Sequence, residues 1–176
     1  MKNNADKRLY YLLAIGVVVV VVGIIAGLAG EGDNNGGGSI DGKTAQLNFD
    51  EKRFDFGRVS MADGKISHRF KFKNEGEGDL TIDDLFTSCM CTNAALIING
   101  KKGPSYGMPM AGQAGIPFWN EQLKPGEEAE LEVTFDPNAH GPDGTGPITR
   151  AITLVSNDSG INKSKTDLII TAKVIK

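Results

Sequence analysis

From residue 45 to the end of the chain, apolar and polar residues alternate with a period of two in several short stretches. In "ISHRFKFKN" (66–74), one face carries the apolar residues and His68, while the other carries only polar and basic residues. The same alternation recurs in "AELEVTF" (129–135) and in "DLIITAKVI" (167–175). Because neighbouring side chains of a strand point to opposite faces, this pattern predicts β-strands with one buried and one wet face.

Turn-forming residues separate these stretches. They occur in "NEGEG" (74–78), "LKPGE" (123–127) and "SNDSG" (156–160), where Gly, Pro, Asn and Asp favour the backbone conformations of turns. Six to eight short strands at such spacings are typical of a two-layered β domain. The sequence therefore predicts an all-β fold, an immunoglobulin-like antiparallel β-sandwich over residues 45–176.

The N-terminal region has a different pattern. Residues 9–29, "LYYLLAIGVVVVVVGIIAGLA", carry no charge, and as a helix they would extend about 31 Å, the thickness of a bilayer core. Basic residues precede this stretch and acidic ones follow it, so the positive-inside rule places residues 1–8 in the cytoplasm. We expect an uncleaved, single-pass transmembrane helix, a Gly-rich linker at 30–44, and a domain outside the cytoplasm. A cleaved signal peptide is the alternative.

The charge balance argues against nucleic acid as a partner. With 19 basic and 22 acidic residues the net charge is −3, and nucleic-acid binding requires clustered positive charge. "GGSIDGKT" (37–44) matches the phosphate-binding P-loop pattern, but that loop works between a strand and a helix. Here the motif follows a linker and precedes the strand-like "AQLNF" (45–49). We therefore expect no nucleotide partner either.

One connection is longer and more apolar than a turn. Residues 100–127 are rich in Gly and Pro, and they include Tyr106, Phe118 and Trp119. Long connections in compact domains are often functional, and aromatic residues are enriched at protein interfaces. The sequence predicts an interaction loop that packs on the domain and carries these three aromatic residues.

Both cysteines of the chain, Cys89 and Cys91, lie in "TSCMCT" (87–92) with one residue between them. On an extended strand their Cα atoms would be about 6.6–6.8 Å apart, so a disulfide would be strained unless the chain turns. Three interpretations stay open: two buried structural residues, a redox pair, or a thiolate site for Cu(I). In the last of these, Met90, Met108 or Met110 would add a thioether ligand, and the "MPM" at 108–110 favours the latter two.

Neither histidine is assigned to this site. His68 lies on the apolar face of its predicted strand, which is typical of a core or edge histidine with satisfied hydrogen bonds. His140 lies in the turn-rich "DPNAHGPDG", which predicts a solvent-exposed loop.

Four pieces of the sequence resemble one bacterial family. They are "FDFGRV" (54–59), "FKFKNEGEGDLTIDDLFTSCMCT" (70–92), "LKPGEEAELEVTFDP" (123–137) and "SND" (156–158). In this order they resemble the domain of unknown function numbered 1573, an immunoglobulin-like sandwich related to the ASH (Hydin-type) and major-sperm-protein domains. That family usually has Gly between the two cysteines, where this chain has Met90. The resemblance implies the fold and a location in the cell envelope, with no enzymatic activity established for the family.

These features together predict a membrane-anchored, extracytoplasmic domain that is not an enzyme. We expect it to bind another envelope protein or a cell-wall component, through an exposed strand edge or through the loop at 106–119. The alternative is thiol-based Cu(I) binding or redox chemistry at Cys89 and Cys91.

Overall fold

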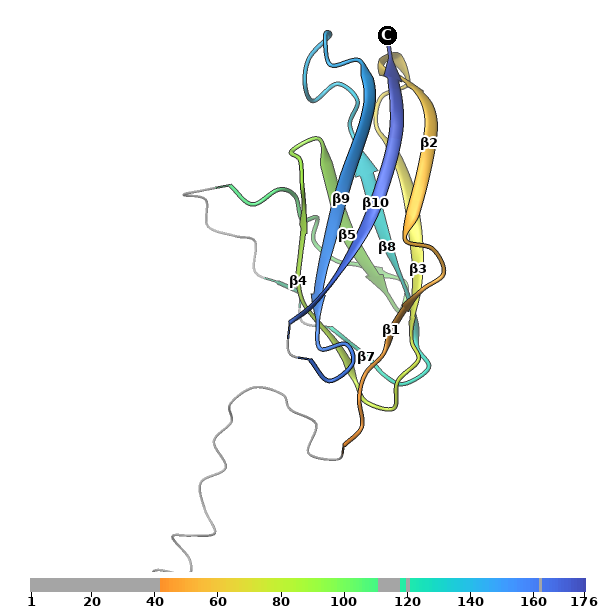
Figure 1. Ribbon diagram of the computed structural model, residues 1–176, viewed down its shortest axis with the longest axis vertical. Coiled ribbons are helices and arrows are strands. Elements are labelled where there is room, and N and C mark those ends of the chain that lie inside the picture. The colour runs from red at the N-terminus through yellow and green to blue at the C-terminus, as the bar shows by residue number, and fades with distance from the viewer. Residues whose placement is uncertain (1–41, 111–117, 120, 162) are drawn as a thin grey trace, which may run out of the picture. The chain divides into compact units, whose positions relative to one another are not determined.

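The computed structural model describes residues 42–110, 118–119, 121–161 and 163–176 (Figure 1). The chain divides into two compact units, Met1–Gly37 and Gly38–Lys176, and only the second contains described residues. The predicted cytoplasmic residues 1–8, the predicted transmembrane segment 9–29 and most of the predicted linker lie outside the described residues. Among the residues that are described, no helix is long and apolar enough to span a bilayer.

The described residues form two five-stranded sheets. The first sheet has the order β1–β3–β8–β5–β6, with β1 at Leu47–Phe49, β3 at Ile66–Asn74, β8 at Glu128–Phe135, β5 at Thr92–Ile98 and β6 at Lys101–Lys102. The second has the order β2–β10–β9–β4–β7, with β2 at Arg53–Ser60, β10 at Ser164–Ile175, β9 at Gly146–Ser156, β4 at Leu80–Thr87 and β7 at Gln122–Leu123. A short 3-10 helix, η1 (Met61–Asp63), follows β2. The predicted all-β, two-layered architecture is confirmed.

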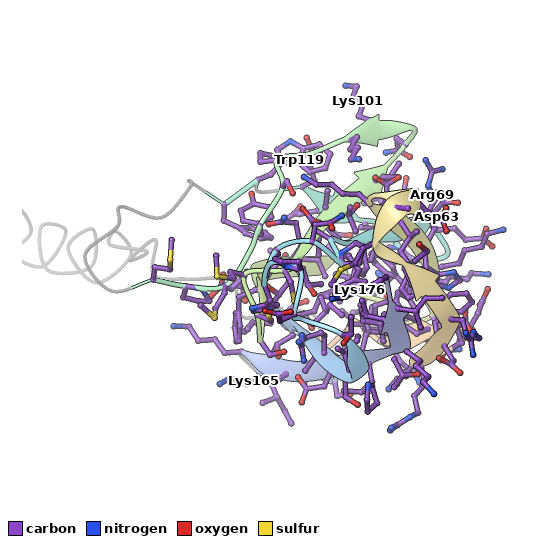
Figure 2. The ribbon with its side chains drawn as sticks, turned by 90° about the horizontal axis from the view of Figure 1, so that it is seen from above. Asp63, Arg69, Lys101, Trp119, Lys165 and Lys176 are labelled. Atoms are coloured by element: carbon purple, nitrogen blue, oxygen red, sulfur yellow. The ribbon has the colours of Figure 1, made fainter. Side chains whose placement is uncertain are left out.

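Strand β3 shows how the alternating pattern produces this fold. It pairs antiparallel with β8, so that Phe70 lies opposite Leu131 and Lys71 lies opposite Glu130. Phe70 and Leu131 are buried, whereas Lys71 is exposed. Each sheet therefore has an apolar inner face and a polar outer face. Figure 2 shows Lys101 and Lys165, which belong to different sheets, projecting on opposite sides of the domain.

One pairing corrects the prediction of an antiparallel sandwich. Strand β2 pairs in parallel with β10, with Phe54 opposite Ile170 and Val59 opposite Val174. The other strand pairs of the described residues are antiparallel. The chain crosses from the first sheet to the second after β1 without reversing, so β2 keeps the direction of β1, which is also that of β10 (Figure 1).

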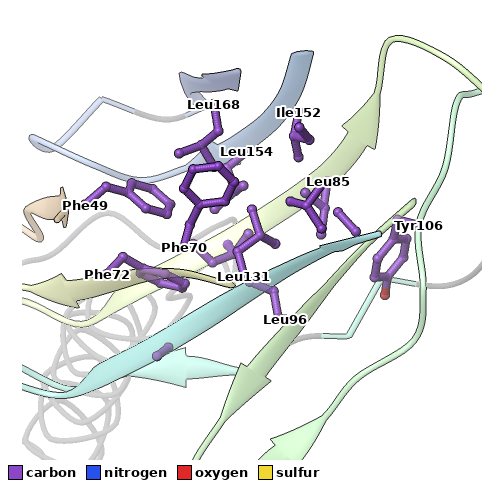
Figure 3. Close-up of a cluster of buried hydrophobic side chains, with 14 of the residues drawn as sticks. Phe49, Phe70, Phe72, Leu85, Leu96, Tyr106, Leu131, Ile152, Leu154 and Leu168 are labelled. Atoms are coloured by element: carbon purple, nitrogen blue, oxygen red, sulfur yellow. The ribbon is translucent and has the colours of Figure 1, made fainter. Parts of the chain in front are cut away.

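The core lies between the inner faces of the two sheets. Phe70 and Leu131 from the first sheet and Leu154 and Leu168 from the second have no solvent exposure (Figure 3). Burying a side chain of this size stabilises the fold by about 1.5–3 kcal/mol. The packed sandwich thus forms a scaffold from which the turns at its ends project.

Candidate functional site

The two cysteines lie in the turn that joins β4 to β5, and not on a strand. The hydroxyl of Thr87 is within hydrogen-bond distance of the carbonyl oxygens of Cys89 (3.1 Å) and Thr92 (2.8 Å). The backbone N–H of Thr92 also donates to the carbonyl of Cys89, at 3.1 Å. These contacts close the turn, so the strand spacing considered above does not apply. Both cysteines are free thiols.

His140 reaches the cysteines from the loop between β8 and β9. Its Nε2 atom lies 3.2 Å from the sulfur of Cys89, and the ligand atoms of Cys89, Cys91 and His140 all lie within 4.8 Å of one another. Cys91 is buried, Cys89 is half-buried and His140 is exposed. The predicted exposure of His140 is correct, but the sequence pattern did not predict that it lies beside the cysteines. We call these three residues the Cys–Cys–His cluster.

Strand pairing explains why a residue 51 positions from Cys89 lies beside it. Strands β5 and β8 are neighbours in the first sheet, and Thr92 lies opposite Phe135. The backbone N–H of Asp136 then donates to the carbonyl of Cys91 at 2.8 Å. The loop after β8 therefore begins next to the cysteine turn. The only sequence signal for this proximity is that the cysteine motif directly precedes one strand, whereas the loop with His140 directly follows another.

Arg150 of β9 contacts the same cluster. Its Nε–H donates to the sulfur of Cys91 at 3.1 Å. The cysteine turn is also joined to β9 by two hydrogen bonds between Ser88 and Ala151, each 2.9 Å long. No sequence pattern marks Arg150 as a neighbour of the cysteines, since its position follows from the pairing of β4 with β9.

The surroundings of Cys89 affect its ionisation. Burial opposes ionisation of the thiol, but hydrogen bonds from the side chain and the backbone N–H of Cys91, with the positive charge of Arg150, outweigh it. The net result is a pKa of Cys89 below its usual value. Burial in turn opposes the charge of Arg150, yet its interactions with the two sulfurs raise its pKa. The surroundings therefore favour the thiolate of Cys89, the form of a cysteine that binds metals and reacts.

The predicted thioether ligands lie on an exposed segment. Met108 and Met110 are 38% and 47% exposed. The carbonyl of Gly107 accepts a hydrogen bond from the backbone N–H of Thr87 at 3.2 Å, so this segment starts beside the strand that leads to the cysteines. Participation of the two methionines in a metal site stays a prediction.

The aromatic loop packs on the domain through Tyr106. The backbone of Tyr106 exchanges two 2.8 Å hydrogen bonds with Ala94 of β5, and its side chain is buried. Its hydroxyl accepts a hydrogen bond from the backbone N–H of Trp119 at 2.9 Å, and its ring lies 5.1 Å from that of Phe118. Tyr106 thus anchors the loop, whereas Phe118 and Trp119 are partly exposed. Of the three aromatic residues of the predicted interaction loop, these two are the ones that a partner can reach directly.

His68 has the structural role that its position predicts. Its ring stacks on Phe54 with 3.5 Å between ring centres. Its Nε2 atom lies 2.7 Å from a carboxylate oxygen of Glu51. His68 is thus half-buried and hydrogen-bonded, as expected of a core or edge histidine with satisfied hydrogen bonds.

Strand β2 forms a long edge of the second sheet. It has eight residues, whereas the other edge strands β1, β6 and β7 have three, two and two. The carbonyl of Lys52 accepts a hydrogen bond from Ile169 of β10 at 2.9 Å. Because successive peptide groups of a strand point to opposite sides, the N–H and C=O of Arg53 point away from β10. A β-bulge at Gly57 interrupts the edge, and its N–H donates to Asp55 at 3.0 Å.

Comparison with known families gives one match. A family model described as "Protein of unknown function (DUF1573)" matches part of the chain. The match covers residues 47–103. It includes strands β1 to β6 and the two cysteines, but less than half of the 176 residues. Two of the four pieces that suggested this resemblance, 54–59 and 70–92, lie inside the match, and the other two lie beyond it. No curated protein matches the sequence.

The solved structures that this chain resembles are distant from it in sequence. A protein of unknown function from Porphyromonas gingivalis W83 is 18% identical, with a TM-score of 0.50, over 74% of this chain and 47% of that one. The VesB protease of Vibrio cholerae is 16% identical, with a TM-score of 0.49, over 73% of this chain and 32% of that one. The ASH/PapD-like domain 7 of human CEP192 is 12% identical, with a TM-score of 0.45, over 76% of this chain and 87% of that one. The chain spans about half of the Porphyromonas protein and a third of VesB. The Porphyromonas structure supports the sandwich fold and nothing further.

Proposed function

We propose that this protein is a non-catalytic binding module of the cell envelope, held at the membrane by residues 9–29 with its domain outside the cytoplasm. The observation that carries the proposal is the eight-residue open edge of β2. The uncharged stretch at 9–29 and the basic residues before it support the anchor and its orientation.

The partner would add an extended segment to β2. An added strand pairs with the outward N–H and C=O groups of the edge, and side-chain contacts then give specificity. Arg53 and Arg58 are exposed on this strand, so acidic side chains in the added segment are favoured. The bulge at Gly57 bends the edge, which limits uncontrolled pairing between copies.

The charge distribution elsewhere supports a role without catalysis. A depression of about 670 Å³ lies on the outer face of the first sheet, where Arg69 and Glu130 are among its lining residues. Arg69 pairs with Glu130 at 3.1 Å and with Glu132 at 3.0 Å. Two carboxylates of this face are thus held in ion pairs with Arg69, which favours a structural role for them over a catalytic one.

Site-specific photocrosslinking in intact cells tests this proposal. A photoreactive residue in place of Arg58 should give one discrete adduct that fractionates with the membrane. The same residue in place of Lys101, on the short edge strand β6, should give none. Arg53→Pro removes an outward N–H and should reduce the adduct several-fold, because that donor pairs with the added strand. Arg53→Ala keeps the N–H and should reduce it less.

Two results would contradict this proposal. Equal adducts from positions 58 and 101 would indicate random collision. An adduct unaffected by Arg53→Pro, in a variant whose thermal unfolding matches that of the parent, would exclude strand addition at this edge.

A further inference from the structure

We propose that the Cys–Cys–His cluster is a binding site for one Cu(I) ion. This site is independent of the partner proposed for β2. The three ligand atoms lie within 4.8 Å of one another. An ion bonded to thiolate and imidazole ligands at about 2.0–2.3 Å holds them no more than about 4.6 Å apart. Small side-chain rotations are therefore enough to bring all three atoms into one coordination sphere.

The turn that carries the sulfurs is organised before any ion binds. The backbone N–H of Cys91 points at the sulfur of Cys89, at 3.4 Å. The Thr87 hydroxyl contacts the carbonyl oxygens of Cys89 and Thr92. The backbone N–H of Asp136 donates to the carbonyl oxygen of Cys91. Cys91 is buried and fixed, while His140 lies on the solvent side. An ion can therefore enter from solvent past the imidazole and reach two sulfurs that are already close together.

The ligand set selects for a soft ion. Two thiolates and an imidazole bind Cu(I) or Zn²⁺ in preference to hard cations such as Mg²⁺ and Ca²⁺. Structural Zn²⁺ sites almost always use four protein ligands, whereas Cu(I) is stable with three. The cluster offers three, which is enough for Cu(I), whereas Zn²⁺ at this site would need a water as its fourth ligand. Binding releases the thiol protons to solvent and changes no oxidation state.

Arg150 adds selection by charge. Its guanidinium lies 3.1 Å from the sulfur of Cys91 and is half-buried. Two thiolates and one guanidinium carry a single net negative charge. A monovalent ion neutralises that charge, whereas a divalent ion leaves an excess positive charge in a partly desolvated site, which is unfavourable. The N–H···S hydrogen bond also orients Cys91, as outer-shell partners of metal ligands commonly do.

The test is anaerobic Cu(I) titration of the full, reduced chain in detergent against a chromogenic Cu(I) chelator. The wild-type chain should withdraw one equivalent of copper, and Cys89→Ser with Cys91→Ser should withdraw none. Loss of an outer-shell partner typically weakens metal binding 10–100-fold, so His140→Ala, which removes a direct ligand, should weaken it by at least about tenfold. Asp143→Ala, an exposed position in the same loop, is the matched control and should bind as wild type. X-ray absorption at the copper edge should show two sulfur ligands and one nitrogen.

Two results would overturn this proposal, and a third would remove only the selecting role of Arg150. The double cysteine variant could bind as tightly as wild type, or His140→Ala could bind unchanged with a sulfur-only absorption spectrum. The third concerns charge: Arg150→Gln should lower the ratio of Cu(I) to Zn²⁺ affinity, and an unchanged ratio would exclude selection by Arg150. Thermal unfolding of each variant separates loss of ligands from loss of fold.

Discussion

Asn74 shows how a single polar residue holds one end of the sandwich together. Its side chain is fully buried. The amide nitrogen donates to the carbonyl oxygens of Gly78 at 2.8 Å and Leu123 at 3.0 Å. The amide oxygen accepts from the backbone N–H groups of Gln46 at 3.2 Å and Gly76 at 3.0 Å. All four hydrogen bonds available to an asparagine are made. This side chain therefore joins the residue before β1, the turn after β3, and strand β7.

Asn74→Asp should therefore destabilise the domain strongly. The new carboxylate keeps its acceptors but loses both donors, and it places buried negative charge against two carbonyl oxygens. We expect a loss of about 2–4 kcal/mol in the free energy of unfolding, measured by urea denaturation at pH 7. Asn48→Asp, the same change at an exposed position of β1, is the control. Equal losses for the two variants would contradict this role of Asn74.

At the residue scale, the sequence pointed to the two cysteines of the Cys–Cys–His cluster but not to its histidine. Cys89 and Cys91 stand out because they are close in sequence. His140 and Arg150 reach them through the neighbouring strands β8 and β9. The alternating pattern tells which face of a strand is buried, but not which strands are neighbours or in what register. Contacts between distant loops depend on that missing information.

At the scale of elements, β3 and β8 carry complementary charges on their outer faces. In the register of the pair, Arg69 lies opposite Glu132 and Lys71 opposite Glu130. Glu132 also pairs with Lys102 of β6. The polar faces of β3 and β8 were predictable from sequence, and their charge pairing follows once the two strands are neighbours. The parallel direction of β2 was not predictable, since it depends on where the chain changes sheets.

The free energy of unfolding should depend on pH through Glu132. The hydrogen bond from Lys102 lowers the pKa of this carboxyl, burial acts in the opposite direction, and Arg69 lowers it further. A lowered pKa means that the ionised carboxylate stabilises the fold. That contribution is complete above the unfolded-state pKa of about 4.3 and is lost as the pH falls through the lower folded-state pKa.

Glu132→Gln should consequently destabilise the domain at pH 7, by about 1 kcal/mol. The difference from wild type should shrink as the pH falls below about 4.3, in urea denaturation series at several pH values. Glu128→Gln, at an exposed position of the same strand, should show a smaller difference. A Glu132→Gln difference that stays constant down to the acid limit would contradict the assignment.

At the scale of the whole domain, the fold was predictable because one simple pattern recurs in many strands. Each alternating stretch has an apolar face that must be covered, and two sheets facing each other cover all of them at once. Strands that meet in the core hold both β2 and the Cys–Cys–His cluster in place. The binding proposed for each of them therefore depends on this scaffold.

Phe70 is the residue at which this dependence can be measured. It comes from β3 of the first sheet and is fully buried close to Leu154 and Leu168 of the second (Figure 3). Phe70→Ala leaves a cavity between the sheets and should cost about 3–5 kcal/mol, a large part of the roughly 5–15 kcal/mol that stabilises a typical domain. Phe54→Ala, at a half-buried position of β2, should cost distinctly less. Urea denaturation of both variants measures these losses in the free energy of unfolding. A greater loss for Phe54→Ala than for Phe70→Ala would contradict this prediction, because the main stabilising contacts would then lie at the β2 edge and not between the sheets.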